Sequence, residues 1–347
     1  MLVEKIRVNA GKGYDVVVGE NIISNAGEFI KDVLSPNKIA VITDDNVDKL
    51  YADVLEKSLS DAGFSIVKFV FTAGESSKNL KTYGQIIEFL AQNELTRADA
   101  VVALGGGVVG DMAGFVASTY LRGVKYVQIP TTLLSQIDSS VGGKTAVDLP
   151  QGKNLVGAFC QPSLVICDVS VLRDLPKDVY IDGMGELAKY AILDKNIYNE
   201  LIKEDRDLIK LVKMSIDYKR KVVEEDEFEQ GIRKFLNLGH TPCHGIEKAS
   251  NYTISHGKAV GMGLKIMTAS ALKKGYINLE VYNDLMAMFD ATVGGENCPF
   301  DAKTLAKNAL KDKKRDKNMI TVVTIHGIGD ARLETIDVDL LEELFTV

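Results

Sequence analysis

Residues 100–110 read AVVALGGGVVG, and they indicate the class of fold. The apolar run 100–104 predicts a short strand buried on both faces, and three glycines follow it directly. Residues 105–110 match the pattern G-x-G-x-x-G between a strand and a helix, which is typical of a phosphate cradle at a helix N-terminus. The same glycines also fit an ordinary tight turn. Moreover, this is not the first strand–helix turn, where the dinucleotide fingerprint usually lies.

Apolar strands alternate with amphipathic helices on both sides of this stretch. We expect strands at 38–43, 65–71 and 126–129, helices at 47–62 and 80–92, and an opening hairpin of 2–8 with 14–18. Continuous apolar strands separated by helices predict a mostly parallel, Rossmann-like sheet that is covered on both faces.

The pattern changes near Pro176. Helical periodicity then predicts helices at 182–192, 197–203, 207–224, 239–249 and 257–274. One last β-like segment, 319–325, precedes a terminal helix at 339–345. A chain of 347 residues exceeds the usual size of a single core. We therefore expect a nucleotide-binding α/β domain over 1–177 and a mainly helical, metal- and substrate-binding domain over 178–347, with the cleft between them as the default active site.

Composition excludes several classes of protein. The net charge of −7, with 46% hydrophobic and 26% charged residues, fits a globular protein and argues against a non-specific nucleic-acid binder, which would be basic. The four cysteines show no paired spacing, so neither a disulfide framework nor a thiolate zinc site is indicated. The N-terminus lacks the apolar run of a signal peptide, and no window approaches the length of a membrane-spanning helix. We expect a cytoplasmic protein without membrane contact.

Polar loops follow several of the predicted strands. Asp44 comes directly after the strand at 38–43, where a carboxylate accepts both ribose hydroxyls of NAD and repels a 2′-phosphate. A helix N-cap is an equal alternative, since Asp45 and Asn46 are also good capping residues. Residues 74–78, GESSK, form a further polar loop after a strand. Together with the glycine-rich turn, these loops favour a nucleotide site.

Lysines lie beside glycines in the next segment. Residues 138–144 read DSSVGGK, and Lys153 and Asn154 follow shortly after. Small residues let an anion approach the backbone while ammonium groups neutralise its charge. The pattern predicts a phosphate or carboxylate site, and the alternative is a solvated loop.

Three of the four histidines cluster at His240, His244 and His256. The first two are four residues apart, which places both on one helix face. Imidazoles with a carboxylate are a standard zinc or cobalt environment, and the absence of H-E-x-x-H excludes the zinc-protease pattern. Glu186 lies among small and apolar residues, where a buried carboxylate needs a partner such as a metal. The alternative is a surface pair with Lys189 of little energetic consequence.

Over essentially its whole length the chain resembles the 3-dehydroquinate synthases, a family of sugar-phosphate cyclases. Four long segments carry the resemblance: 105–162 (GGGVVGDMAGFVASTYLRGVKYVQIPTTLLSQIDSSVGGKTAVDLPQGKNLVGAFCQP), 183–192 (GMGELAKYAI), 232–247 (IRKFLNLGHTPCHGIE) and 255–263 (SHGKAVGMG). The resemblance implies a dehydroquinate synthase-like fold, with NAD and Zn²⁺ or Co²⁺ as cofactors.

The resemblance also assigns residues to the site. The metal ligands it implies are Glu186, His240 and His256, whereas His244 falls on the family's catalytic histidine. The other catalytic positions are Asn237, Lys153, Lys189 and Asp138. Substrate contacts map to Lys144, Asn154, Lys219, Arg233 and one lysine of the pair Lys313 and Lys314. NAD contacts map to Asp44, Asn46, Glu75, Lys78, Gly107, Val108, Val109, Gly110, Asp111, Thr131, Thr132, Lys144, Lys153, Leu172, Arg173 and Asp174.

The implied reaction is a phosphate-eliminating lyase reaction of the shikimate pathway, which leads to aromatic amino acids. The implied substrate, a phosphorylated sugar acid, is 3-deoxy-D-arabino-heptulosonate 7-phosphate, and the products are 3-dehydroquinate and phosphate. Transient oxidation at C5 by NAD, β-elimination of phosphate, re-reduction, ring opening and aldol closure follow in turn. The resemblance further implies a homodimer, in which Arg122 reaches the substrate phosphate of the neighbouring subunit.

Five positions depart from the family pattern. Gly185 stands where alanine is usual, and Cys243 and Gly245 replace a common glycine and alanine. Lys258 stands where glutamate is commonest, and Asp174 replaces a frequent threonine in the NAD segment. None of these changes removes a ligand or a pocket residue that the resemblance implies.

Three rival functions share parts of this pattern. A metal-dependent polyol dehydrogenase would have the same two-domain plan, but a polyol needs no cluster of phosphate-binding cations. Another sugar-phosphate cyclase would act on a different sugar, and Asn237, His244 and Arg233 together favour the dehydroquinate reaction. A non-catalytic NAD-binding protein would have no need of an intact ligand set.

Overall fold

In the computed structural model, residues 3–310 and 318–347 are described. They form two compact units. The first comprises Met1–Leu175 with Lys219–Glu224, and the second comprises Pro176–Tyr218 with Glu225–Val347.

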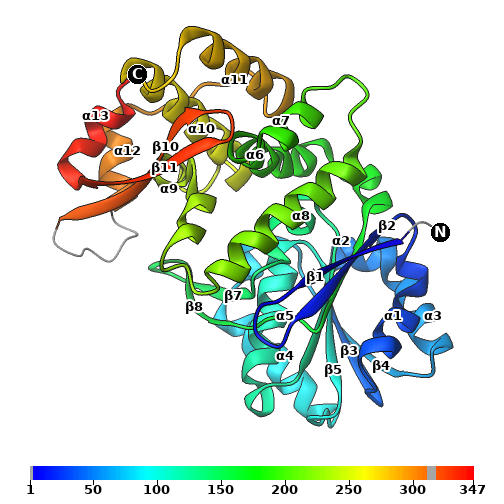
Figure 1. Cartoon of the computed structure of the whole chain (residues 1–347). Coiled ribbons are helices and arrows are strands. Elements are labelled where there is room, and N and C mark those ends of the chain that lie inside the picture. The colour runs from blue at the N-terminus through cyan, green and yellow to red at the C-terminus, as the bar shows by residue number, and fades with distance from the viewer. Residues whose placement is uncertain (1–2, 311–317) are drawn as a thin grey trace. The chain divides into compact units, whose positions relative to one another are not determined.

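The first unit is built on a seven-stranded sheet with the order β1-β2-β9-β6-β5-β3-β4. Five of these strands, β1 to β5, are labelled in Figure 1. Its strands are β1 (Val3–Val8), β2 (Tyr14–Gly19), β3 (Lys38–Asp44), β4 (Ser65–Phe71), β5 (Ala100–Gly105), β6 (Lys125–Pro130) and β9 (Leu164–Asp168). The opening hairpin pairs β1 antiparallel to β2, and the other pairings of this sheet are parallel. The predicted strands and the mostly parallel sheet are therefore confirmed.

The helices of the first unit are α1 (Ala26–Val33), α2 (Asp45–Val47), α3 (Asp53–Asp61), α4 (Leu80–Gln92) and α5 (Gly107–Thr119). The expected helix 47–62 is helical as far as Asp61, but a π-helical turn, Asp48–Ala52, separates α2 from α3. Helix α5 starts directly after β5 and packs against β5, β6 and β3. At Gly114 a Cβ atom would lie 2.4 Å from Cγ2 of Thr145, so glycine is needed for this close approach.

A two-stranded hairpin occupies residues that the sequence pattern presented as loops. Strand β7 (Lys144–Leu149) pairs antiparallel with β8 (Gly152–Phe159). The side chains of β8 are half-buried or exposed along its whole length. A strand without a buried face shows no period-2 pattern of apolar residues, so hydrophobic patterning could not reveal it.

The second unit is mainly helical, as predicted. Its helices are α6 (Lys177–Leu193), α7 (Lys195–Leu201), part of α8 (Leu208–Glu225), α9 (His240–Ala249), α10 (His256–Lys273), α11 (Leu279–Thr292), α12 (Ala302–Ala309) and α13 (Leu341–Phe345). Helix α10 is the centre of this unit, because it packs against α6, α9, α11 and α13. In the part of the chain that the structure describes, no helix is both long and apolar enough to span a bilayer.

The predicted single β-like segment is one half of a second hairpin. Strand β10 (Met319–Gly327) pairs antiparallel with β11 (Asp330–Asp337), which the sequence pattern missed. Strand β11 reads DARLETID and has no fully buried residue, whereas the middle of β10 is buried. Only β10, which is partly buried, therefore has a pattern of apolar residues that predicts a strand.

Candidate functional site

Three residues of the second unit form a candidate metal centre. Glu186 lies on α6, His240 opens α9, and His256 opens α10. Oε1 of Glu186 lies 3.3 Å from Nε2 of His240 and 3.0 Å from Nε2 of His256. One ligand atom from each residue lies within 4.8 Å of the other two. Residues far apart in the sequence thus converge because the three helices pack on one another.

This donor set fits a divalent transition metal. Two donors about 2.1 Å from one ion in tetrahedral geometry lie about 3.4 Å apart. The distances of 3.0 and 3.3 Å between donor atoms are close to that spacing. A carboxylate and two imidazoles are ligands for zinc and cobalt, and three protein ligands leave a fourth position for a substrate, as in catalytic sites.

Backbone contacts hold the two imidazoles in place. Nδ1 of His240 lies 3.2 Å from the carbonyl oxygen of Leu238, which leaves Nε2 as the nitrogen that faces Glu186. At the start of α10, the Asp182 carboxylate accepts hydrogen bonds from the backbone N–H groups of Gly257 and Lys258, at 2.6 and 3.2 Å. A Cβ atom on Gly257 would lie 1.8 Å from the carbonyl oxygen of Asp182. Only glycine therefore lets α10 begin this close to α6.

Glu186 and Lys189 form a buried ion pair, so the alternative of a surface pair is wrong. Nζ of Lys189 lies 2.6 Å from Oε2 of Glu186, one helical turn away. Burial opposes ionisation of the carboxyl group, but Lys189 and the two imidazoles outweigh it and hold the pKa of Glu186 well below its usual value. The carboxylate is therefore ionised and ready to bind a cation.

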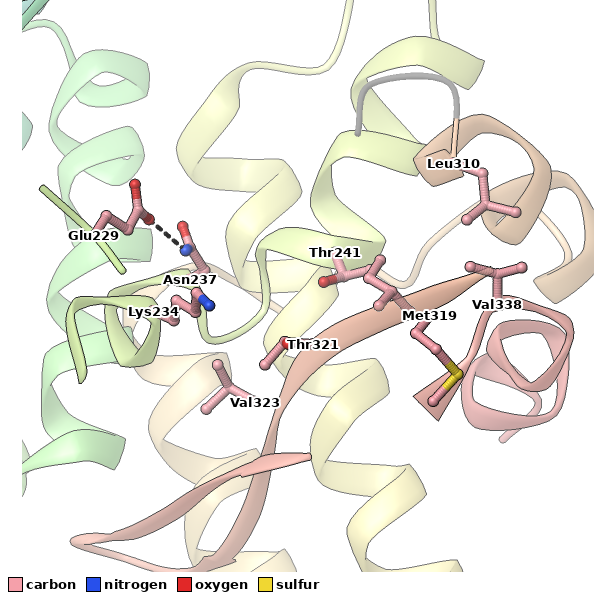
Figure 2. Close-up of a pocket in the computed structure, with 10 residues that line it drawn as sticks. Glu229, Lys234, Asn237, Thr241, Leu310, Met319, Thr321, Val323 and Val338 are labelled. Atoms are coloured by element: carbon pink, nitrogen blue, oxygen red, sulfur yellow. Dashed lines mark hydrogen bonds between the residues drawn. The ribbon is translucent and has the colours of Figure 1, made fainter. Parts of the chain in front are cut away.

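His244 and Asn237 were both predicted to be catalytic. The His244 ring lies on the same helix face as His240, with ring centroids 5.9 Å apart. Asn237 lines a cavity of about 270 Å³ together with Thr241, Thr321 and Val323 (Figure 2).

A carboxylate that the sequence pattern missed contacts this asparagine. Nδ2 of Asn237 donates a hydrogen bond of 2.7 Å to Oε1 of Glu229, drawn as the dashed line in Figure 2. Glu229 lies in the polar segment before Arg233, and nothing in its spacing distinguishes it from neighbouring acids. Arg233 itself is almost fully buried, and its guanidinium donates to the carbonyl oxygen of Glu227.

The predicted nucleotide residues lie in the first unit and, apart from Lys144 and Lys153 on β7 and β8, they lie at or after the carboxyl ends of its strands. Asp44 caps α2: its Oδ1 accepts from the backbone N–H groups of Asn46 and Val47, both at 3.0 Å. The capping role is therefore observed, and the NAD contact stays a prediction. The glycine-rich residues 107–111 form the first turn of α5. Val109 is fully buried in the core, so only its backbone is available to a ligand.

A buried lysine links two of the predicted loops. Nζ of Lys78 donates to Oδ2 of Asp111 and to Oδ1 of Asn154, each at 2.6 Å, and lies 3.9 Å from Oε1 of Glu75. Burial disfavours the ammonium form, but Asp111 and Glu75 outweigh it and raise the pKa of Lys78. The Lys78 ammonium thus contacts residues of three elements: η3 (Glu75–Ser77), α5 and β8.

Five further residues that were predicted to contact NAD lie in two short segments of the first unit. Thr131 and Thr132 follow β6, and the backbone N–H of Thr131 donates to the carbonyl oxygen of Gly105 at 3.0 Å. Leu172, Arg173 and Asp174 end a 3₁₀ helix after β9, where Leu172 is buried and Asp174 accepts a 2.9 Å hydrogen bond from Tyr51.

Cations that were predicted to bind the substrate occur in both units. Lys219 is buried, and its ammonium donates to the side chain of Asp138 and to its carbonyl oxygen. Lys144 is exposed at the start of β7, and Lys153 is half-buried in β8. Arg122 is exposed in a left-handed conformation, with φ 66°. Lys313 and Lys314 lie outside the described residues.

Comparisons with known proteins match both halves of the chain to 3-dehydroquinate synthases. A family model described as 3-dehydroquinate synthase N-terminal matches residues 68–182, and one described as 3-dehydroquinate synthase C-terminal matches residues 183–315. The chain is 40% identical over 344 residues to a 3-dehydroquinate synthase from Streptococcus suis, covering 96% of this chain and 97% of the relative. It is 41% identical over 354 residues to one from Streptococcus thermophilus, covering 98% and 99%.

Solved structures share the fold at lower identity. A 2-deoxy-scyllo-inosose synthase complexed with carbaglucose-6-phosphate, NAD⁺ and Co²⁺ matches with a TM-score of 0.88, 24% identity and 99% coverage of both chains. A 2-epi-5-epi-valiolone synthase from Streptomyces hygroscopicus with NAD⁺ and Zn²⁺ bound matches with a TM-score of 0.82, 23% identity and 95% coverage of both. With two family models and full-length relatives at 40% identity, the chain is an enzyme of the 3-dehydroquinate synthase family.

Proposed function

We propose that this enzyme converts 3-deoxy-D-arabino-heptulosonate 7-phosphate into 3-dehydroquinate and phosphate, with NAD and a zinc or cobalt ion as its cofactors. The observation that carries the proposal is the convergence of Glu186, His240 and His256 at a spacing that suits one divalent ion. The reaction belongs to the shikimate pathway, and we expect it to take place in the cytoplasm.

Glu186, His240 and His256 would hold the metal ion. When bound, the ion supplies a Lewis acid that acidifies a substrate hydroxyl, and NAD supplies a hydride acceptor. The buried Lys189 keeps the Glu186 carboxylate ionised. It also limits the negative charge that this carboxylate adds next to an anionic substrate.

Fixed cations would bind the substrate's carboxylate and phosphate groups. Lys144, Lys153 and Lys219 supply point charges, and Arg233 supplies a planar fork that matches paired oxygens. Lys219 is held by Asp138, and Arg233 by a backbone carbonyl, so both side chains are oriented before the substrate arrives. Preorganised charges lower the entropy lost on binding and stabilise charge that develops during phosphate elimination.

His244 and Asn237 would control proton positions near the reacting atoms. An imidazole exchanges protons near neutral pH, so the His244 ring is suited to hold or donate one during the reaction. The amide of Asn237 is oriented by the bond from its Nδ2 to Glu229, which leaves Oδ1 as its acceptor towards a substrate hydroxyl.

The rival functions differ in what they release. A polyol dehydrogenase would release NADH in step with product, whereas the proposed reaction regenerates NAD⁺ in each cycle. The buried cations Lys219 and Arg233 support a substrate with strong negative charge, which a polyol lacks. A cyclase for a different sugar is disfavoured because the full-length identity of 40% is to 3-dehydroquinate synthases.

One assay separates these possibilities. The purified enzyme is incubated with the heptulosonate phosphate, substoichiometric NAD⁺ and zinc or cobalt, and phosphate and dehydroquinate are followed together. We expect equal amounts of both products, many turnovers per NAD⁺ and no matching rise in absorbance from NADH. Release of NADH in step with product would favour the dehydrogenase, and a lack of any turnover would favour a non-catalytic protein.

We also propose that the active form is a homodimer in which Arg122 acts on the substrate of the partner subunit. Leu121 and Arg122 both adopt left-handed backbone conformations, with φ 50° and 66°. Two consecutive non-glycine residues in this conformation cost conformational free energy. Such strain is concentrated at functional sites, where it fixes the orientation of a side chain.

A further inference from the structure

The imidazole of His256 lies between two carboxylates, one at each ring nitrogen. Its Nε2 lies 3.0 Å from Oε1 of Glu186, and its Nδ1 lies 3.4 Å from Oε1 of Glu247. When Nε2 binds a metal ion, the neutral ring carries its single N–H on Nδ1, so only Nδ1 can donate a hydrogen bond. One carboxylate must therefore face the metal-binding nitrogen, and the other must face the N–H.

Glu247 reaches this ring from helix α9. It lies seven residues, or about two helical turns, after His240, so both side chains project from the same face of the helix. Its side chain is only 6% exposed. A buried carboxylate without a partner is costly, and the ring of His256 is one such partner. The sulfur atom of Cys243, between them on the same face, lies 3.8 Å from Oε2 of Glu247 and 3.9 Å from Nδ1 of His256.

We propose that Glu247 is a positioning residue that accepts a hydrogen bond from Nδ1–H of His256 and thereby directs Nε2 of that ring towards the metal. The inference rests on the metal site proposed above. A distance of 3.4 Å is slightly longer than an ordinary N–H···O bond, and a small rotation of the ring closes it. The tautomer that this bond selects leaves the lone pair on Nε2, where Glu186 and His240 supply the other donors.

The two histidine ligands are then held in different ways. His240 donates to the neutral carbonyl oxygen of Leu238, whereas His256 donates to a charged carboxylate. A carboxylate acceptor raises the basicity of the imidazole more than a carbonyl does, so His256 becomes the stronger donor to the ion. Loss of such a partner typically lowers metal affinity about 10- to 100-fold.

The same atoms suggest one competing role. Cys243, Glu247 and His256 offer a sulfur, an oxygen and a nitrogen within 4.8 Å of one another, which is a possible ligand set for a second ion. Both nitrogens of His256 would then have to bind metal at once. The positioning role predicts one ion per chain, and the second site predicts two.

The test compares Glu247→Ala, Glu247→Gln and Cys243→Ala in the full-length chain, with Glu186→Ala as the variant that lacks a ligand. Zinc affinity is measured by competition with a chromophoric chelator, and bound zinc per chain by elemental analysis. The cobalt-loaded proteins are compared by visible absorption. Long-range ¹H–¹⁵N spectra of the zinc-loaded protein report which nitrogen of each histidine carries the proton.

We expect one zinc per chain, and for Glu247→Ala a dissociation constant raised about 10- to 100-fold with a shifted cobalt spectrum. Glu247→Gln should lose less zinc affinity than Glu247→Ala, because its amide oxygen still accepts a hydrogen bond from Nδ1–H. It should still lose some affinity, because the amide carries no charge. The Cys243 side chain lies near the same nitrogen, Nδ1 of His256, but it is not a carboxylate. The zinc affinity of Cys243→Ala should therefore equal that of the unsubstituted chain. The Nδ1–H signal of His256 should be present in the unsubstituted chain.

Three results would overturn the inference. These are unchanged zinc affinity in Glu247→Ala, an equal loss in Cys243→Ala, or two ions per chain that fall to one in Glu247→Ala. If the unsubstituted chain bound no zinc or cobalt, the metal site of the proposed function would itself be wrong, together with this inference. Normal binding by both the unsubstituted chain and Glu247→Ala would remove only the role of Glu247.

Discussion

Nζ of Lys189 lies 2.6 Å from Oε2 of Glu186, and the two side chains are only 1% and 3% exposed. A fully buried ion pair cannot lose one partner without leaving the other charge uncompensated. Because Glu186 is also a candidate metal ligand, Lys189 balances its charge whenever no ion is bound. The stability of the metal-free enzyme should therefore depend on this lysine.

We expect Lys189→Met to lower the stability of the metal-free enzyme by up to about 3–5 kcal/mol, because the buried Glu186 carboxylate loses its lysine partner and keeps only the contacts with the two imidazoles. Saturating zinc should restore part of the loss, since the cation then pairs with Glu186. Urea unfolding in EDTA and in zinc measures both effects. Lys57→Met, which removes an exposed pair with Asp61, is the control and should cost less than about 1 kcal/mol. An equal cost for the two variants in EDTA would contradict the prediction.

The metal ligands should be separable from the catalytic histidine. Alanine in place of Glu186, His240 or His256 should sharply lower the metal content, because each removes one of three donors. His244→Ala should keep its metal and lose rate. Elemental analysis and turnover are measured on the same samples. The assignment would be wrong if His244→Ala proved metal-free while His256→Ala bound metal normally.

The two roles of Asp44 can be separated by one substitution. Asparagine caps a helix about as well as aspartate, so Asp44→Asn should retain the stability that the contacts to Asn46 and Val47 provide. It loses the charged acceptor for the ribose hydroxyls, which should weaken NAD binding about 10-fold or more. Calorimetric titration with NAD⁺ measures this. Unchanged affinity in Asp44→Asn would leave Asp44 with its capping role alone.

Stability at low pH should depend in part on Asp99. Burial opposes ionisation of this carboxyl group, but hydrogen bonds from Thr96 and from the backbone N–H of Lys38 outweigh it and lower the pKa. A lowered folded pKa contributes stability that is present above the unfolded value of about 3.9 and is lost as pH falls through the folded pKa. Asp99→Asn should therefore cost about 1–3 kcal/mol at pH 7 and less below pH 4. A cost that is the same in urea unfolding at both pH values would exclude the charge as its cause.

Arg122 should act across a dimer interface. Arg122→Ala should raise the KM for the heptulosonate phosphate or lower turnover, while metal and NAD binding stay unchanged. In a heterodimer of Arg122→Ala with Glu186→Ala, one site has an intact Glu186 and receives Arg122 from the other chain, so activity should return. Purified heterodimers with two different tags provide the measurement. Heterodimers as inactive as both parents would exclude a shared site.

The fold class and the family could both be predicted from the amino-acid sequence alone. Strand β5 is apolar throughout and β3 is apolar over 39–42, and the long helix α8 is amphipathic, so these elements could be predicted without a structure. The residue types at Glu186, His240 and His256 predicted a metal site, and the motifs around them carry the resemblance that implies the reaction.

Which side chains contact one another depends on how the helices and strands pack. That Glu186 and Lys189 form a buried rather than a surface pair depends on how α6 packs against α10, which spacing along one helix cannot reveal. The carboxylates of Glu229 and Glu247 look like ordinary surface acids in the sequence, yet they contact Asn237 and His256. Four strands, β7, β8, β9 and β11, were not predicted. Strands β8 and β11 have no buried face, so their pairing depends on the partner strand and not on their own pattern. Strand β9 is buried along its length, but a short apolar run cannot be told from a buried helical segment by its pattern alone.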